Sequence, residues 1–229
     1  MTSPMSPPSM TAALRWRARL NRMRRWLWQA LCFRMVFGEV SGGQPRPATR
    51  ISPSTCIEHE DRLLLEDDVF IGHFNFIEAS AGITIGAGTQ ITNFVSIVTH
   101  STHRSVRVAA RVPGAPGPAA DGSFASDIRA PIRIGAHCFI GPHCVVEAGT
   151  VLGKGCLVAS HSRVRGTFPD FAVVSGCPAR VVGDTRTQDA RWLAEHPDHL
   201  TAYTHWAGAL PSASGMQAAS ASPFPPHDA

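Results

Sequence analysis

Two histidines and an arginine lie close together near the middle of the chain. They are His100, His103 and Arg107, within a segment that reads VTHSTHRSVR from position 98. Imidazole exchanges a proton near neutral pH, so a histidine can remove the proton from a hydroxyl group while that hydroxyl attacks a carbonyl carbon. The chain has 11 histidines, and a histidine taken at random is more often structural. The surroundings of His100 therefore decide whether it is a candidate base.

Aliphatic residues recur every six positions on both sides of this segment. They fall at Ile134, Ile140, Val146, Leu152, Val158 and Val164 after it, and at Leu65, Ile71, Ile77, Ile85, Ile91 and Ile97 before it, with a weaker trace at Ile51, Ile57 and Leu63. A period of six fits neither a helix nor a flat strand. It predicts a parallel β-helix, a prism with three short strands per coil that each direct one aliphatic side chain inward. Three hexads per coil give about five coils over residues 51–166, with two-residue register slips after Leu63 and Ile77.

The repeat stops after Ile97 and resumes at Ile134. This interruption predicts a loop over residues 99–131, with His100 at its first turn. A long loop that leaves a regular solenoid usually carries function.

The cysteines suggest neither a disulfide framework nor a metal site. No pair has the C-x-x-C spacing, and Cys56, Cys138, Cys144 and Cys156 coincide with the small-residue positions of the repeat. We expect these four to be buried small residues in a reducing cytoplasm.

Charge separates the N-terminal part from the rest. Of 21 basic residues only Lys154 is a lysine, and seven arginines but no acidic residue precede position 38. Removing those seven charges takes the net charge from +4 to −3, so the main body gives no reason to expect a nucleic-acid partner. Residues 14–37 combine these arginines with apolar residues at helical spacing, which predicts a basic amphipathic helix.

That helix has two interpretations. Trp26, Trp28, Phe33 and Phe37 could lie in a membrane interface while arginines meet anionic headgroups, or the helix could pack on its own domain or on a neighbouring subunit. Its apolar run is too short to cross a bilayer, and it does not resemble a signal peptide. The sequence therefore predicts a cytoplasmic protein, with contact to the inner face of the cytoplasmic membrane under the first interpretation. Residues 1–13 and 207–229 are predicted to be disordered.

At these residues the chain resembles the hexapeptide-repeat acyltransferases. The similarity covers about residues 51–183, and it includes galactoside and maltose O-acetyltransferases and acetyltransferases of polysaccharide biosynthesis. It implies an all-β-dominated fold: a left-handed parallel β-helix of about five coils, with the N-terminal helix, the projecting loop and a short C-terminal helical segment over residues 185–206. It further implies acetyl transfer from acetyl-CoA to a hydroxyl of a sugar or glycan, without a metal. Homotrimers are expected, with each active site between two prisms.

The resemblance also implies roles for particular residues. His100 would be the general base in a direct transfer, and His103 and Arg107 would contact the acceptor from the same loop. His73 and Asn75, in the segment GHFNF, would contact the acceptor from the preceding coil. For Asn75 a purely structural place at a coil corner is an equal alternative.

Three residues near the end of the repeat would bind coenzyme A. They are Ser160, Arg165 and Arg180, the last within SGCPARVV, which resembles the closing signature G-x-P-A-R-x-[IV] of the superfamily. A guanidinium group suits phosphate recognition, although Arg180 could instead form a structural salt bridge.

Two other functions are compatible with the repeat. A carbonic-anhydrase-like metalloenzyme needs three histidines on one zinc ion, but His137 and His143 are six residues apart and would lie on successive faces. A non-catalytic trimeric scaffold would need neither the His100 loop nor the closing motif. The sequence does not determine the acceptor, the length of the acyl chain, or whether oxygen or nitrogen is acylated.

Overall fold

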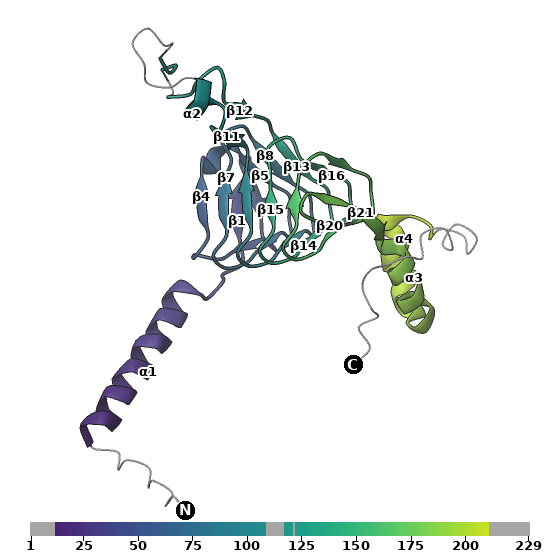
Figure 1. The fold of residues 1–229 in the computed structure, drawn as a ribbon. Coiled ribbons are helices and arrows are strands. Elements are labelled where there is room, and N and C mark those ends of the chain that lie inside the picture. Colours follow the sequence, from purple (N-terminus) through teal and green to yellow (C-terminus); the bar gives the residue numbers. More distant parts are fainter. Residues whose placement is uncertain (1–11, 109–116, 121, 211–229) are drawn as a thin grey trace, which may run out of the picture.

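The structure is a computed structural model that describes residues 12–108, 117–120 and 122–210. The segments predicted to be disordered lie mostly outside these residues, and only their inner ends, 12–13 and 207–210, are described. The centre of the molecule is a three-faced β-helix, from which one helix projects at the N-terminal end and two helices at the C-terminal end (Figure 1).

Three sheets form the faces of the prism, and their strands run parallel from coil to coil. The first face contains β3 (Arg50–Ile51), β6 (Phe70–Ile71), β9 (Gln90–Ile91), β14 (Phe139–Ile140), β17 (Leu157–Val158) and β20 (Ala172–Gly176). The second face contains β4 (Cys56–Glu58), β7 (Phe76–Glu78), β10 (Ser96–Val98), β15 (Val145–Val146) and β18 (Arg163–Val164). The third face contains β5 (Leu63–Leu65), β8 (Ile83–Ile85), β13 (Ile132–Ile134), β16 (Val151–Leu152) and β19 (Thr167–Phe168). The described chain thus makes five full coils, and β20 begins a sixth.

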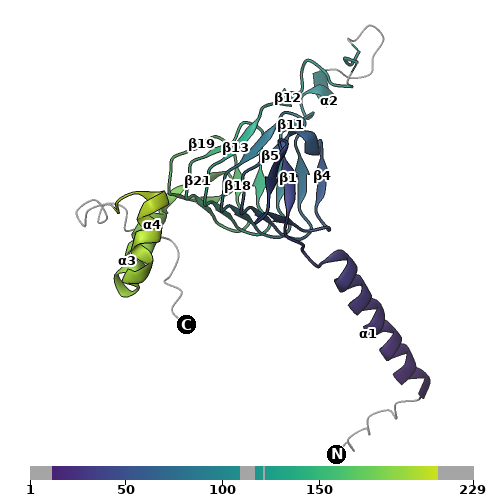
Figure 2. The same cartoon turned by 180° about the vertical axis from the view of Figure 1, so that it is seen from behind.

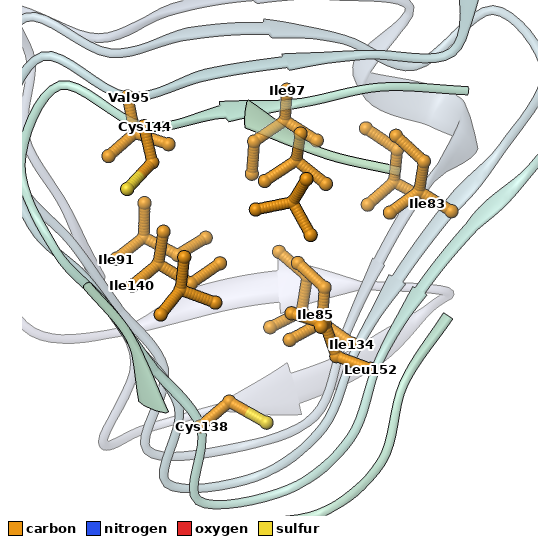
Figure 3. Close-up of a cluster of buried hydrophobic side chains, with 14 of the residues drawn as sticks. Ile83, Ile85, Ile91, Val95, Ile97, Ile134, Cys138, Ile140, Cys144 and Leu152 are labelled. Atoms are coloured by element: carbon orange, nitrogen blue, oxygen red, sulfur yellow. The ribbon is translucent and has the colours of Figure 1, made fainter. Parts of the chain in front are cut away.

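The repeat predicted from the sequence forms the core. Ile71, Ile91, Ile140 and Val158 pair in register along the first face, and all four are fully buried. Figure 3 shows such stacks meeting inside the prism. The inward aliphatic positions are therefore confirmed.

The register slips have a simple cause on the third face. Each of β5, β8 and β13 directs two residues inward, as Ile83 and Ile85 do on either side of the exposed Thr84. The strands β16 and β19 direct only one residue inward. The early coils are consequently longer than three hexads.

Three of the four repeat cysteines are buried as predicted. The thiols of Cys138, Cys144 and Cys156 donate to the carbonyl oxygens of residues in the next coil, over 3.1, 3.0 and 3.2 Å. The prediction is wrong for Cys56, which is exposed. Thr55 occupies the corner position instead, donating from its hydroxyl to Gly72 O, so the alternation of β4 turns Cys56 outward.

We name the corners of the prism after the faces that they join. The first corner joins the first and second faces, the second corner joins the second and third, and the third corner joins the third and first. At the first corner the rings of Phe74, Phe94, His143 and His161 stack in a ladder, with centroids 5.2, 5.0 and 4.9 Å apart. Each of these residues has a positive φ near 60°, so the aromatic stacking accompanies a backbone conformation that residues other than glycine rarely adopt.

Further elements adjoin the two ends of the prism. At the N-terminal end the helix α1 (Ala12–Cys32) is followed by a hairpin of β1 (Glu39–Ser41) and β2 (Gln44–Arg46), and Ser41 exchanges hydrogen bonds with Leu63 and Leu65 of the first coil. The α1 helix begins two residues before the predicted start and ends at Cys32 rather than at residue 37. A 3₁₀ turn, η1 (Glu60–Arg62), lies at the second corner of the first coil.

The C-terminal segment follows a strand that reverses direction. The strand β21 (Ala179–Asp184) runs antiparallel to β20 and leads into α3 (Thr185–Glu195), the 3₁₀ turn η2 (Pro197–His199) and α4 (Leu200–Ala207). The Asp184 carboxylate caps α3 by accepting from the Arg186 N–H. The Trp206 ring packs on His137, 4.2 Å between centroids, which attaches α4 to the third corner.

Candidate active site

The long loop leaves the prism at the second corner, as a two-stranded arm (Figure 2). Its base pairs β11 (His100–Ser101) with β12 (Ile128–Arg129) in antiparallel register, and α2 (Ser105–Val108) follows β11. The buried Ser105 hydroxyl donates to the Asp127 carboxylate, which also accepts from the Phe124 N–H. The hydrogen bond from Ser105 lowers the pKa of Asp127, so this carboxylate ties the two sides of the arm together as an anion.

His100 lies against a carboxylate at the base of this arm. Its Nδ1 atom is 2.7 Å from Glu78 Oε2, and the His100 side chain is 33% exposed whereas that of Glu78 is 2% exposed. Glu78 ends β7, which is paired in register with β10 of the next coil, so the carboxylate comes to lie beneath the first residues of the arm. The Glu78 carboxylate accepts hydrogen bonds from Ser80 N–H (2.8 Å), from Thr99 N–H (3.1 Å) and from the Thr99 hydroxyl (2.8 Å).

These contacts set the protonation of Glu78. Burial raises its pKa, but the contacts with Ser80, His100 and Thr99 outweigh burial and lower the pKa from 4.5 to about 2. Glu78 is therefore an anion at neutral pH. A carboxylate beside Nδ1 favours the imidazole tautomer that carries its proton on Nδ1, which leaves the lone pair of Nε2 free to accept a proton.

The lowered pKa of Glu78 predicts how the stability of the fold changes in acid. A carboxyl group with a depressed pKa stabilises the fold fully above its ordinary pKa, near 4.5, and loses this contribution as the pH falls toward 2. We expect Glu78→Gln to remove on the order of 3 kcal/mol of pH-dependent stability in that window. The measurement is the free energy of unfolding in urea as a function of pH. Glu58 has the same register position one coil earlier but is exposed, so Glu58→Gln should keep the parent's dependence of unfolding free energy on pH. If Glu78→Gln also kept the parent's dependence on pH, the lowered pKa of Glu78 would be contradicted.

Two predicted site residues lie on the same arm as His100. His103 is exposed, with Nδ1 2.8 Å from the Ser101 hydroxyl oxygen. Arg107 donates to the main-chain oxygen of His103 over 2.8 Å. Both side chains thus take part in the internal hydrogen bonds of the arm, close in sequence to His100. Arg165 is exposed at the same second corner, directly after β18, which pairs with β15 as β15 pairs with β10.

The other predicted residues lie elsewhere in the single chain. His73, Asn75 and Ser160 are at the first corner, at the opposite edge of the second face from His100. His73 Nδ1 is 2.6 Å from the Ser52 hydroxyl oxygen, and Ser160 is exposed. Arg180 lies on β21 at the end of the first face and donates to Ala179 O. The predicted site residues therefore form separate groups at the first corner, at the second corner and at the C-terminal end of the prism.

Asn75 is engaged with the main chain. It is 2% exposed, its amide donates to Gly72 O and Thr92 O, and its side-chain oxygen accepts from Val95 N–H over 2.7 Å. Both amide hydrogens are thus donated within the prism. This geometry matches the structural alternative, a polar residue that links successive coils at a corner.

Sequence reasoning missed Glu78, the buried partner of His100. The available signal was an acidic residue directly after an inward aliphatic residue, Ile77, one coil before the loop. That signal was ambiguous because Glu58 has the same place in the preceding coil and is exposed.

Histidines do not converge on a metal position among the described residues. His137 lies at the third corner and His143 at the first, and no group of three or more His, Cys, Asp or Glu side chains within the described ranges has an arrangement that could hold a metal ion.

The fold and the repeat define a left-handed parallel β-helix of the hexapeptide type. Residues 131–166 match the family described as bacterial transferase hexapeptide (six repeats). Together with the relatives given next, this match confirms the predicted resemblance to the hexapeptide-repeat superfamily and the predicted fold class.

The proteins that are similar to this chain include two curated relatives and one solved structure. "Probable acetyltransferase Rv3034c" of Mycobacterium tuberculosis is 33% identical over 129 residues, which are 56% of this chain and 39% of the relative. "Putative lipopolysaccharide biosynthesis O-acetyl transferase WbbJ" of Escherichia coli K12 is 26% identical over 134 residues, 57% of this chain and 64% of the relative. This chain therefore spans less than two thirds of either protein. AntD, an N-acyltransferase from Bacillus cereus, has the same fold with a TM-score of 0.50 and 14% identity, covering 67% of this chain and 88% of AntD.

Proposed function

We propose that this chain transfers an acetyl group from acetyl-CoA to a hydroxyl group of a sugar or glycan. The observation that carries the proposal is the contact between Glu78 and His100 at the base of the arm, which prepares an imidazole as a base at a partly exposed position. The names of the two curated relatives, an acetyltransferase and an O-acetyl transferase of lipopolysaccharide biosynthesis, support the reaction class.

His100 performs the proton transfer in this proposal. A sugar hydroxyl is too weak an acid to attack a thioester at neutral pH, so Nε2 accepts its proton as the new C–O bond forms. The Glu78 carboxylate stabilises the imidazolium ion that results. When the tetrahedral oxyanion collapses, the C–S bond breaks and the imidazolium returns the proton to the departing thiolate. No covalent enzyme intermediate is needed, because both substrates meet in one cleft.

The separation of the site residues supports a homotrimer. In a ring of three prisms, the second corner of one chain meets the first corner of its neighbour, and a site between them combines His100, His103 and Arg107 with His73 of the next chain. The first corner also exposes the rings of Phe74 and Phe94, which association would cover. The molar mass in solution, measured by light scattering, tests this assembly: a monomeric active enzyme would overturn it.

Coenzyme A would lie toward the late coils, against Ser160, Arg165 and Arg180. We expect Arg180→Ala to raise the KM for acetyl-CoA about tenfold while kcat changes less, because a guanidinium that binds phosphate contributes equally in ground and transition states. Steady-state kinetics with varied acetyl-CoA measures this. Arg191→Ala, an exposed arginine on α3, is the matched control, and an unchanged KM in Arg180→Ala would remove Arg180 from the coenzyme site.

The activity itself is tested with purified full-length chain, acetyl-CoA and a panel of saccharide acceptors. Release of free coenzyme A thiol and the acetylated product are both measured, so that thioester hydrolysis is distinguished from transfer. Transfer to hydroxyl acceptors is expected. Transfer only to amino sugars would change the acceptor atom, and no transfer to any acceptor would favour the trimeric scaffold.

A further inference from the structure

The side chains of α1 make few contacts with the rest of the described chain. It has 21 residues, none of which is buried, and it extends away from the prism in both views (Figures 1 and 2). Trp16, Trp26 and Trp28 are each more than 60% exposed. Such large apolar side chains on an isolated helix need a partner, because helices of this length gain most of their stability from packing.

The apolar and basic residues of α1 occupy distinct positions around its axis. Trp16, Leu20, Met23, Leu27 and Leu31 recur at intervals of three and four and form one apolar stripe. At 100° per residue, Arg17 and Arg24 fall along one edge of this stripe and Arg19 along the other. Arginines at the edges of an apolar stripe can place their charged ends among headgroups while their stems extend the apolar surface.

The base of α1 is attached to the prism. The ring of Phe33, directly after the helix, lies 5.3 Å from Phe74 and 5.1 Å from His73, between ring centroids, and so extends the aromatic ladder of the first corner. Arg50 places its guanidinium over the rings of Phe37 and Phe70. The helix therefore leaves from a defined place at the N-terminal end of the prism.

Charge decides between a lipid surface and a second copy of the helix. The α1 helix contains six arginines, and no acidic residue precedes Glu39 in the sequence. Joining the apolar stripes of several copies in a bundle would bring these arginines together without counter-charges, which is destabilising. A membrane with anionic phospholipids offers the apolar layer and the compensating charge at once.

From the unpartnered stripe and its arginine edges we infer that α1 is an interfacial membrane-binding helix that selects anionic phospholipid surfaces. No helix in the described part of the chain is long and apolar enough to cross a bilayer, so the helix would lie in the plane of the interface. This inference does not depend on acetyl transfer.

Vesicle co-sedimentation of the full-length chain tests it. The probes are phosphatidylcholine vesicles and vesicles of phosphatidylcholine mixed with phosphatidylglycerol. We expect binding to the mixed vesicles that weakens with added salt, and little binding to phosphatidylcholine alone. The triple variant Arg17→Gln, Arg19→Gln and Arg24→Gln should bind the mixed vesicles about 100-fold more weakly, since each basic residue near an anionic surface contributes roughly a factor of five.

A second variant tests the apolar stripe. Leu20→Ser with Leu27→Ser should also lower binding, by about tenfold or more, without altering net charge. The control for the loss of an arginine charge outside α1 is Arg191→Gln on α3, and the control for the loss of an apolar side chain is Leu200→Ser on α4, both at exposed positions. Both controls should bind like the parent chain.

Three outcomes would overturn the inference. They are equal binding to both kinds of vesicle, binding that survives the arginine and leucine variants, and loss of the parent molar mass in the leucine variant without vesicles. The last result would show that α1 packs on other copies of the chain. Acetyl transfer to a soluble acceptor, measured in the same variants, separates a failure of this inference from a failure of the proposed function.

Discussion

Replacing His100 with alanine is expected to lower the rate of acetyl transfer by about 10²–10⁴-fold, the range that general-base catalysis contributes in enzymes. The loss should appear in kcat, because the base acts when the acceptor hydroxyl attacks and not when substrates bind. The fold should persist, since the His100 side chain is one-third exposed and lies outside the aliphatic core. Glu78 would keep its donors from Ser80 and Thr99, so the substitution does not leave an isolated buried charge.

The measurement is steady-state release of coenzyme A thiol in the presence of an acceptor, with molar mass and thermal unfolding as checks on the fold. His103→Ala is the comparison variant, because it removes a second imidazole from the same arm without touching Glu78. As an acceptor contact, His103 should affect the KM for the acceptor more than kcat. A His100 variant with parent kcat would exclude this residue as the base. If His103→Ala alone abolished transfer, the base would be the exposed histidine instead.

The sequence predicted the core well because stacking in a prism is periodic. Each inward residue repeats the chemistry of the residue one coil away, as Ile91 and Ile140 do across the loop, so period six identifies the interior directly. The error at Cys56 arose at the weak first coil, where the small position belongs to Thr55 and a shift of one residue turns a side chain from inside to outside.

The candidate site was harder to predict because it depends on geometry that has no period. The loop position singled out His100, but its partner Glu78 comes from another coil through strand register. Spacing alone could not distinguish Glu78 from Glu58, because both have the same position within the repeat. They differ in their surroundings, since His100 lies against Glu78 whereas Glu58 is exposed. The grouping of His73 and Asn75 on another corner likewise follows from strand connectivity.

The second large effect is expected at Glu78, which acts on the reaction through His100 and is therefore a positioning residue. In Glu78→Gln the side chain keeps its size, but an amide can present a donor to Nδ1 where the carboxylate presents an acceptor. The imidazole would then favour the proton on Nε2, the atom that must accept the proton of the acceptor hydroxyl. We expect kcat to fall by about 10²-fold or more, with a smaller change in the KM for acetyl-CoA.

Three comparisons distinguish positioning from a general loss of structure. Glu78→Asp keeps the negative charge and should recover part of kcat, while Glu58→Gln, its counterpart in the preceding coil, should behave like the parent chain. The His100→Ala and Glu78→Gln double variant should be scarcely slower than His100→Ala alone, because Glu78 has no imidazole left to orient. Additive losses in the double variant would instead mean that Glu78 serves the fold or another step, and that His100 acts without it.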